Sequence, residues 1–216
     1  MLHFKNQWML LMALWLWTTL GVAALPADIA GYVTRVRGDV AVENAAGRQP
    51  LALGQPLHLR DHIVTGANAR LEAQMRDGMV VTLGENTEFA IKQIMGVSAN
   101  SENSIFGLIK GVFRSATHHA EGNLPKEPCR VETPVATIGI RGTELWGGFN
   151  LLDSGSTTLD VVMLEGKGVY VESAGQRVEL KQAGDGTTVK GTGQSPTPLK
   201  VWGDKKLQAA QQTVAW

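Results

Sequence analysis

Cysteine is nearly absent from this chain of 216 residues, which carries a single one at position 129. One cysteine excludes an intramolecular disulfide framework and a metal site built from cysteines alone. An excess of either charge is absent too, because 20 Lys and Arg residues balance 20 Asp and Glu residues. This balance argues against a nucleic-acid-binding protein, which normally carries a basic excess, and against an acidic disordered chain. We therefore expect an ordered protein with no nucleic acid among its partners.

Sequence motifs of catalytic and metal sites are lacking as well. The chain contains no G-x-S-x-G elbow, no H-E-x-x-H pair, no phosphate-binding loop and no calcium loop. The neighbours His118 and His119 would point to opposite sides of an extended backbone, and His58 and His62 would need a turn between them to share an ion. Cys129 has no evident base, so we interpret it as a buried apolar residue, with an intermolecular disulfide as the alternative. The sequence thus predicts no enzyme activity, no metal and no cofactor.

The first 24 residues differ from the rest of the chain. Lys5 precedes an apolar run at 8–17, and the small residues Val22 and Ala24 follow it. A weakly basic start, an apolar centre and a small-x-small end predict a secretory signal peptide at 1–24. An uncleaved membrane anchor is the alternative, because the run reaches the lower limit of a bilayer-spanning helix. In both cases we expect the remainder to be exported.

Glycine is in excess, with 25 residues where average usage gives about 15. Between the glycines, apolar and polar residues alternate over short runs, which is the pattern of β-strands. The sequence Asp77-Gly78 between two such runs predicts a tight hairpin. The predicted strands are 32–36, 39–43, 62–65, 70–75, 79–83, 88–92, 105–113, 130–133, 137–140, 159–164, 168–172 and 177–180. We therefore predict an all-β fold, a compact β-solenoid-like or sandwich stack, with a signal helix before it and a short helix from Asp204 after it.

An internal repeat supports this architecture. Residues 38–54 and 166–184 both contain a glycine, a Val-x-Val-Glu strand, a small turn ending in glycine, and a second short strand. Two copies of one unit predict similar hairpins stacked in one fold.

Composition divides the exported part into a folded region and a tail. We expect an all-β domain at 25–190 and a linker with a C-terminal tail at 191–216. Residues 183–199 are rich in Gly, Thr, Ser and Pro, which is typical of a linker. Residues 93–104 and 117–128 lack the strand pattern and are interpreted as exposed loops.

One segment, 133–143, reads TPVATIGIRGT and resembles the signature of the FecR-domain family, the periplasmic part of ferric-citrate-type regulators. Upstream, the sequence from Asp61 to Gly66 resembles the family's D-x-[IV]-x-T-G element, and Asp77-Gly78 opens a hairpin like the family's. The matching signature residues are Thr133, Pro134, Ala136, Ile138, Ile140, Arg141, Gly142 and Thr143. With a closing strand at 164–171, the resemblance extends over about 31–190.

The resemblance implies an exported, non-enzymatic protein-interaction module in the periplasm of a Gram-negative bacterium. Its expected partner is an envelope or outer-membrane protein, contacted through sheet edges and the loops between 93 and 128. Because few residues precede the apolar run, we expect a free-standing version without the family's anti-sigma segment. Contact with a membrane is expected only through residues 1–24, if they stay uncleaved.

The residues around the signature also predict local roles. Pro134 keeps the chain extended, and the guanidinium of Arg141, with its five donors, would clamp loop carbonyls, with ligand contact as the alternative. Gly142 would permit a bend. Trp146 and Phe149 follow, and they would either cap the core or contact a partner protein or a sugar ring. A cell-wall or polysaccharide-binding module is therefore the alternative function.

Overall fold

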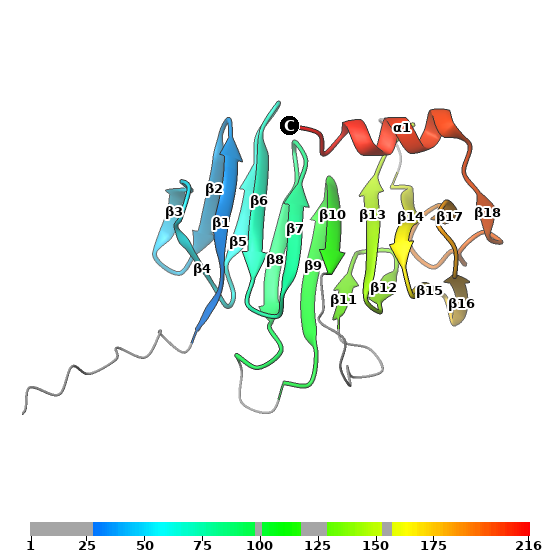
Figure 1. Cartoon of the computed structure of the whole chain (residues 1–216), viewed down its shortest axis with the longest axis horizontal. Helices are drawn as coiled ribbons and strands as arrows, with labels where there is room; N and C mark the ends of the chain where they lie inside the picture. The colour runs from blue at the N-terminus through cyan, green and yellow to red at the C-terminus, as the bar shows by residue number, and fades with distance from the viewer. Residues whose placement is uncertain (1–27, 98–100, 118–128, 153–156) are drawn as a thin grey trace, which may run out of the picture.

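The computed structural model describes residues 28–97, 101–117, 129–152 and 157–216, and it shows two nine-stranded sheets packed face to face (Figure 1). Sheet 1 contains, in spatial order, β18 (Lys200–Val201), β17 (Asp185–Val189), β14 (Leu159–Gly166), β13 (Thr143–Phe149), β10 (Val112–Thr117), β7 (Met79–Leu83), β6 (Arg70–Met75), β1 (Ile29–Arg37) and β4 (Pro56–His58). Sheet 2 contains β16 (Gln176–Leu180), β15 (Val169–Ser173), β12 (Thr137–Ile140), β11 (Cys129–Glu132), β9 (Ser104–Lys110), β8 (Glu88–Gln93), β5 (His62–Thr65), β2 (Val40–Asn44) and β3 (Gly47–Pro50). One helix, α1 (Asp204–Gln212), follows the strands. The predicted all-β fold is confirmed.

The chain builds both sheets in step, from one end of the molecule to the other. It crosses repeatedly between the sheets, and apart from the exchanged positions of β1 with β4 and β2 with β3, the strand order of each sheet follows the sequence. Neighbouring strands are antiparallel, except for the parallel pair β9 and β11. This steady advance gives the sandwich its solenoid-like character.

Alternating side chains fill the space between the sheets. Leu71, Phe89, Phe106 and Ile138 are among the fully buried residues of this core, and the rings of Phe89 and Phe106 stack with centroids 5.4 Å apart. Burial of each such side chain contributes roughly 1.5–3 kcal/mol to folding. The strand alternation read from the sequence is therefore what fixes the inner face of each strand.

The two internal repeats form corresponding hairpins. Residues 38–54 contain the hairpin β2–β3, and residues 166–184 contain the hairpin β15–β16. The two hairpins end sheet 2 on its opposite sides, with β3 and β16 as its edge strands. The prediction of two similar hairpins in one fold is confirmed.

Three parts of the strand prediction were wrong. Residues 105–113 are not one strand, because Gly111, with a φ of 83°, turns the chain out of β9 in sheet 2 and into β10 in sheet 1. The strand β13 begins at Thr143, where no strand was predicted. The short strands β4 and β18 were not predicted.

The expected linker at 183–199 is also wrong in its first half. Residues 185–189 form β17, which pairs with β14 through antiparallel hydrogen bonds. Two polar residues of β17 are buried and bonded: Asp185 accepts the backbone N–H groups of Lys181 and Gln182 at 2.9 Å, and the Thr187 hydroxyl donates to the Thr197 carbonyl at 2.6 Å.

The C-terminal tail packs on the outer face of sheet 1, as Figure 1 shows for α1. The helix predicted from Asp204 is confirmed, although its N-cap is Gly203. This face has its own apolar cluster, which consists of Val112, Trp146, Val162, Trp202, Ala210 and Val214. At the end of the chain, the guanidinium of Arg35 lies 4.0 Å from the ring centroid of Trp216. We call residues 202–216 the C-terminal strap.

Several expectations fall on residues that the structure does not describe. The predicted signal helix at 1–24 lies outside the described residues, as does nearly all of the predicted loop at 117–128. The predicted loop at 93–104 is described in part, and there Ile94 is buried. Within the described part of the chain, no helix has the length and apolar character needed to cross a membrane.

Candidate functional site

The upstream signature residues hold turns between strands. Asp61 lies in the turn between β4 and β5 and is buried. Its carboxylate accepts the backbone N–H of His58 at 2.7 Å and the side-chain amide of Asn44 at 3.0 Å. The backbone N–H of Gly66 donates to the Asp39 carbonyl at 2.8 Å. These contacts give Asp61 and Gly66 a structural role in the loops that join the sheets.

Asp77 and Gly78 form the hairpin turn between β6 and β7, as the sequence predicted. Gly78 has a φ of 86°, a conformation that glycine adopts without steric cost. The Asp77 carboxylate accepts the Met79 backbone N–H at 3.0 Å and the hydroxyl proton of Ser104 in β9. Asp77 therefore ties the turn of one sheet to a strand of the other.

Thr133 and Pro134 form a turn that leads into β12. The Thr133 hydroxyl oxygen accepts the backbone N–H groups of Val135 and Ala136 at 3.2 and 2.9 Å, so that the side chain closes the turn. Ala136 and Ile138 are buried in the core. This half of the signature thus serves folding.

The Arg-Gly-Thr end of the signature forms the sharp turn from β12 to β13. The Thr143 hydroxyl lies 2.7 Å from the Arg141 carbonyl and 2.9 Å from the Gly168 carbonyl, and it accepts the Gly168 N–H at 2.9 Å. The Arg141 backbone N–H donates to the same Gly168 carbonyl at 3.1 Å, and Gly142 has a φ of 53°. The Thr143 hydroxyl therefore holds this turn together, and the clamp expected from the Arg141 guanidinium stays a prediction. The Arg141 residue is exposed and lines an adjoining groove.

The structure places Trp146 in the core and not at a contact surface. Its side chain is fully buried beneath the C-terminal strap, and its indole N–H donates to the Thr213 hydroxyl at 2.9 Å. The rings of Trp146 and Trp202 meet edge-on, with centroids 6.2 Å apart. Phe149 is partly buried against the main core. The expectation that Trp146 offers a ring to a sugar or to a partner is therefore corrected, and capping of the core is its role in this structure.

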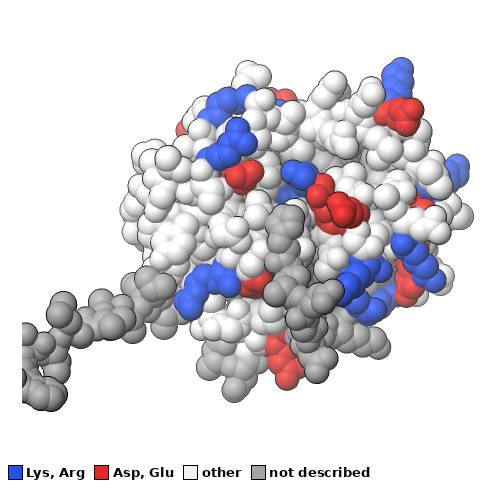
Figure 2. Space-filling view, in the orientation of Figure 1, with Lys and Arg blue, Asp and Glu red and all other residues white. Residues whose placement is uncertain are grey.

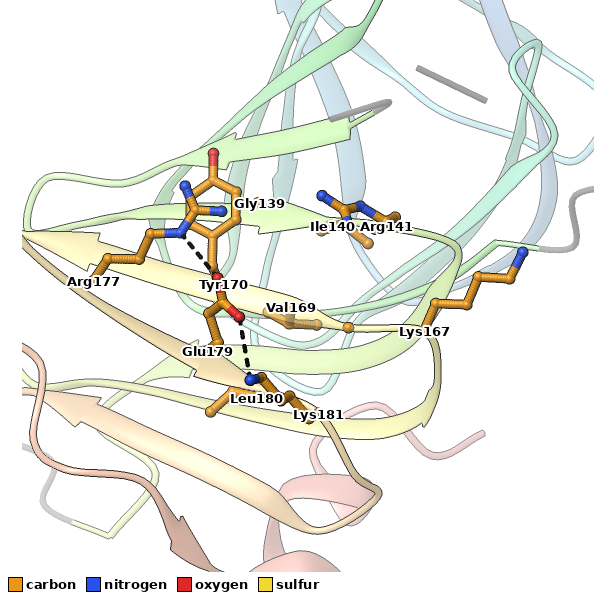
Figure 3. Close-up of a pocket in the computed structure, with 11 residues that line it drawn as sticks. Gly139, Ile140, Arg141, Lys167, Val169, Tyr170, Arg177, Glu179, Leu180 and Lys181 are labelled. Carbon is orange, nitrogen blue, oxygen red and sulfur yellow. Dashed lines mark ion pairs between the residues drawn. The ribbon is translucent and has the colours of Figure 1, made fainter. Parts of the chain in front are cut away.

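A groove of about 320 Å³ lies on the outer face of sheet 2, next to the Arg-Gly-Thr turn (Figure 3). Its walls come from β12, from the β14–β15 turn and from the hairpin β15–β16. The lining residues are Gly139, Ile140, Arg141, Lys167, Gly168, Val169, Tyr170, Arg177, Glu179, Leu180 and Lys181. We call it the basic groove, because it gathers four cationic side chains and one carboxylate.

The floor of the basic groove at one end is the ring of Tyr170. In the register of β12 with β15, Gly139 stands opposite Tyr170, and a Cβ atom at Gly139 would overlap the tyrosine ring. The guanidinium of Arg177 lies 3.5 Å from the centroid of the same ring, as a cation–π contact. Tyr170 is thus held between the Gly139 backbone and Arg177.

Among the described residues that line the basic groove, cations outnumber carboxylates. Glu179 lies between Arg177 and Lys181, with N–O distances of 3.9 and 3.7 Å, as the dashed lines in Figure 3 show. Arg141 and Lys167 add two cations at the other end, so that the lining has a formal charge of about +3, from four cations and one carboxylate. Elsewhere Figure 2 shows acidic and basic side chains interspersed over the viewed face. The groove is thus a local basic region on a neutral protein.

Sequence reasoning missed most of this groove. Of its lining, only Ile140 and Arg141 were among the signature residues identified from the sequence. The alternation Val169-Tyr170-Val171 could have shown that Tyr170 faces outward, but only the strand register brings Gly139 and Arg177 to it.

Cys129 is buried, as the sequence predicted, with its Sγ 3.9 Å from the Sδ of Met79. Burial, and after it the nearby charge of Asp77, raises the pKa of the Cys129 thiol well above its ordinary value. Among the residues that the structure describes, no three His, Cys, Asp or Glu side chains gather in a way that could hold a metal ion.

Comparison with known proteins identifies the family of this domain. Residues 61–167 match the model of the family described as FecR protein, so the resemblance read from the signature is confirmed and this part of the chain belongs to that family. Membership supports a signalling or sensing module, and the family is regulatory and not enzymatic. No curated protein sequence matches the chain.

Solved structures share the fold. A predicted anti-sigma factor from Parabacteroides distasonis ATCC 8503, solved in a crystal at 1.65 Å, superposes with a TM-score of 0.54 and 18% identity over 70% of this chain. A second crystal structure with the same description, at 2.50 Å, gives the same values. The chain spans 64% of the length of that protein. At this identity the likeness establishes a common fold.

Proposed function

We propose that this chain is an exported, non-enzymatic protein-interaction module that takes part in sensing or signalling in the bacterial envelope. The observation that carries the proposal is the FecR match over residues 61–167, which includes both turn elements and the whole Thr133–Thr143 signature. The apolar segment at the start of the chain supports export, and the family supports the periplasm as the compartment.

The use of polar residues in the fold supports a role in contact and not in catalysis. The buried hydroxyl of Thr65 donates to the Gly84 carbonyl at 2.6 Å and accepts the Thr87 N–H at 2.9 Å. The Thr87 hydroxyl in turn accepts the Val112 N–H at 3.0 Å. Such side chains satisfy backbone groups where the chain crosses between sheets, as Asp61 and Thr143 do, and Asp77 does the same in a hairpin turn. The polar atoms of these side chains therefore form hydrogen bonds that hold the fold together.

The edge strands supply the expected mode of contact. An extended segment of another protein can add to an exposed sheet edge through backbone hydrogen bonds. In sheet 1 the edge strands β4 and β18 contain three and two residues, and in sheet 2 the edge strand β3 contains Pro50, which has no N–H to donate. β16, with five residues, is the longest of the four described edge strands. We therefore place the partner at β16.

Site-specific photo-crosslinking tests this function. A photoreactive residue replaces Gln176 on β16, Gln49 on β3 or Gln208 on α1, all of them exposed. In cells that produce the protein naturally, we expect one envelope protein to crosslink from position 176 and much less from the two control positions. Fractionation should recover the complex from the periplasm. A chain that stays in the cytoplasm, or that crosslinks to no protein from position 176, would contradict the proposal.

A further inference from the structure

We infer that the basic groove binds an extended acidic segment of the partner protein; this rests on the proposed function and specifies the chemistry of its contact. The groove is bounded by β16, the strand that ends sheet 2, and lined by four cations. A peptide that carries carboxylates along one side would complement this charge, because opposite potentials across an interface favour encounter and fix register.

The spacing of Arg177 on β16 and Lys181 directly after it fits an extended chain. Residues 177, 179 and 181 alternate along the backbone and therefore lie on one face, about 6.5–7 Å apart from one to the next. In Figure 3 Arg177, Glu179 and Lys181 follow one another along this side of the groove. An added strand has the same repeat, so that two of its carboxylates separated by three residues can lie opposite Arg177 and Lys181.

The guanidinium of Arg177 is already oriented for such a ligand. It stacks on Tyr170, whose ring is supported from the other side by the Gly139 backbone. A stacked guanidinium keeps its N–H groups at its edge, where they can donate to a carboxylate. The same stacking covers the tyrosine face on which a sugar ring would pack, and the geometry therefore favours an acidic peptide over a neutral glycan.

Glu179 restrains this site. Its carboxylate lies within 3.9 Å of Arg177 and 3.7 Å of Lys181, in the position that a ligand carboxylate would share. Like charges facing each other weaken binding. Removing the Glu179 charge should therefore strengthen binding, a gain that an unfolded variant cannot mimic.

Fluorescence anisotropy with a labelled peptide of alternating Glu and Val tests the inference; the same peptide with Gln in place of Glu is the probe control. Wild type should bind the acidic peptide, and the affinity should fall as salt rises to about 0.5 M, where charge interactions are screened. The double variant K167E/K181E should bind about tenfold more weakly or worse, and Glu179→Gln should bind about two- to fivefold more tightly. Lys205→Glu, on α1 at the opposite face of the sandwich, is the matched charge control and should bind like wild type.

Each contrary result has a definite meaning. Equal weakening by K205E would overturn the inference, because it would show an effect of net charge alone. Binding of the Gln peptide as tightly as the Glu peptide, no binding of either, or tighter binding of polygalacturonate than of the Glu peptide would overturn it as well. If K167E/K181E still crosslinks its envelope partner from position 176 as wild type does, the groove assignment fails while the proposed function stands. If wild type crosslinks to no protein, the function itself fails.

Discussion

Trp146 provides the strongest test of how the C-terminal strap is held on sheet 1. Replacement by Ala removes a fully buried indole from the cluster that also contains Trp202, Ala210 and Val214. Truncation of a buried Trp to Ala costs about 3–5 kcal/mol. For a domain of this size, a loss of about 4 kcal/mol lowers the melting temperature by roughly 8–16 °C.

A graded series separates the contributions at this position. Trp146→Phe keeps an aromatic ring but loses the N–H that donates to Thr213, so it should cost about 1–2 kcal/mol. The Thr213 hydroxyl keeps its own bond to the Ala210 carbonyl, at 2.6 Å, and is not left unsatisfied. Leu152→Ala is the control, because Leu152 is 69% exposed and its loss should stay within about 0.5 kcal/mol.

Equilibrium unfolding in guanidinium chloride gives these free energies, and limited trypsin digestion gives a second measurement. In the Ala variant the strap should be cleaved first, at Lys205 or Lys206, while the sandwich persists. A cost below about 1 kcal/mol for Trp146→Ala, or a strap as resistant as that of wild type, would refute the view that Trp146 anchors it.

Three further predictions concern sheet 2. The salt bridge to Lys92 lowers the pKa of Glu132 in the folded protein. The stability that this salt bridge contributes is therefore fully present above the unfolded pKa of about 4.3, and it is lost as the pH falls through the lower folded pKa. Because both side chains are partly exposed, Glu132→Gln should cost about 0.5 kcal/mol of stability at pH 7. Chemical denaturation at pH 7 and at a pH below the folded pKa of Glu132 should show that the difference in stability between wild type and variant disappears in acid. Cys129 is buried and its thiol pKa is raised, so it should react with a disulfide reagent at pH 8 only as fast as the protein unfolds. Because the folded thiol resists ionisation, the free energy of unfolding should fall as pH rises above the pKa of the unfolded thiol. Gly139→Ala should cost about 1–3 kcal/mol by overlap with Tyr170, and less in a Tyr170→Ala background; equal costs in both backgrounds would contradict the contact.

The sequence was sufficient where one residue type decides the local structure. Alternation identified strands such as 137–140, whose inward side chains Ile138 and Ile140 are buried. Asp77-Gly78 predicted its hairpin, because the turn needs a residue with positive φ. These features depend on neighbours in the sequence, and for that reason a single sequence can reveal them.

The sequence was insufficient to predict the structure where residues far apart in the chain determine it. β17 reads as a linker because Asp185 and Thr187 are polar, yet both are buried with partners that only the fold brings near. Trp146 follows the signature and suggested a contact surface, but the strap that covers it comes from the end of the chain. The basic groove likewise depends on the register of three strands.

Glycines on the outer faces show how differently the two sheets are used. On sheet 1, a Cβ atom at Gly84 would lie 2.6 Å from the Thr213 carbonyl, and one at Gly186 would overlap Trp202, so both positions make room for the strap. On sheet 2, Gly139 makes room for Tyr170, which supports the guanidinium of Arg177. The first arrangement covers an apolar face with the chain's own tail, while the second orients a charged group toward solvent. A partner can therefore reach the groove on sheet 2 without displacing any part of the strap, and this is why K167E/K181E should weaken peptide binding while leaving the melting temperature unchanged.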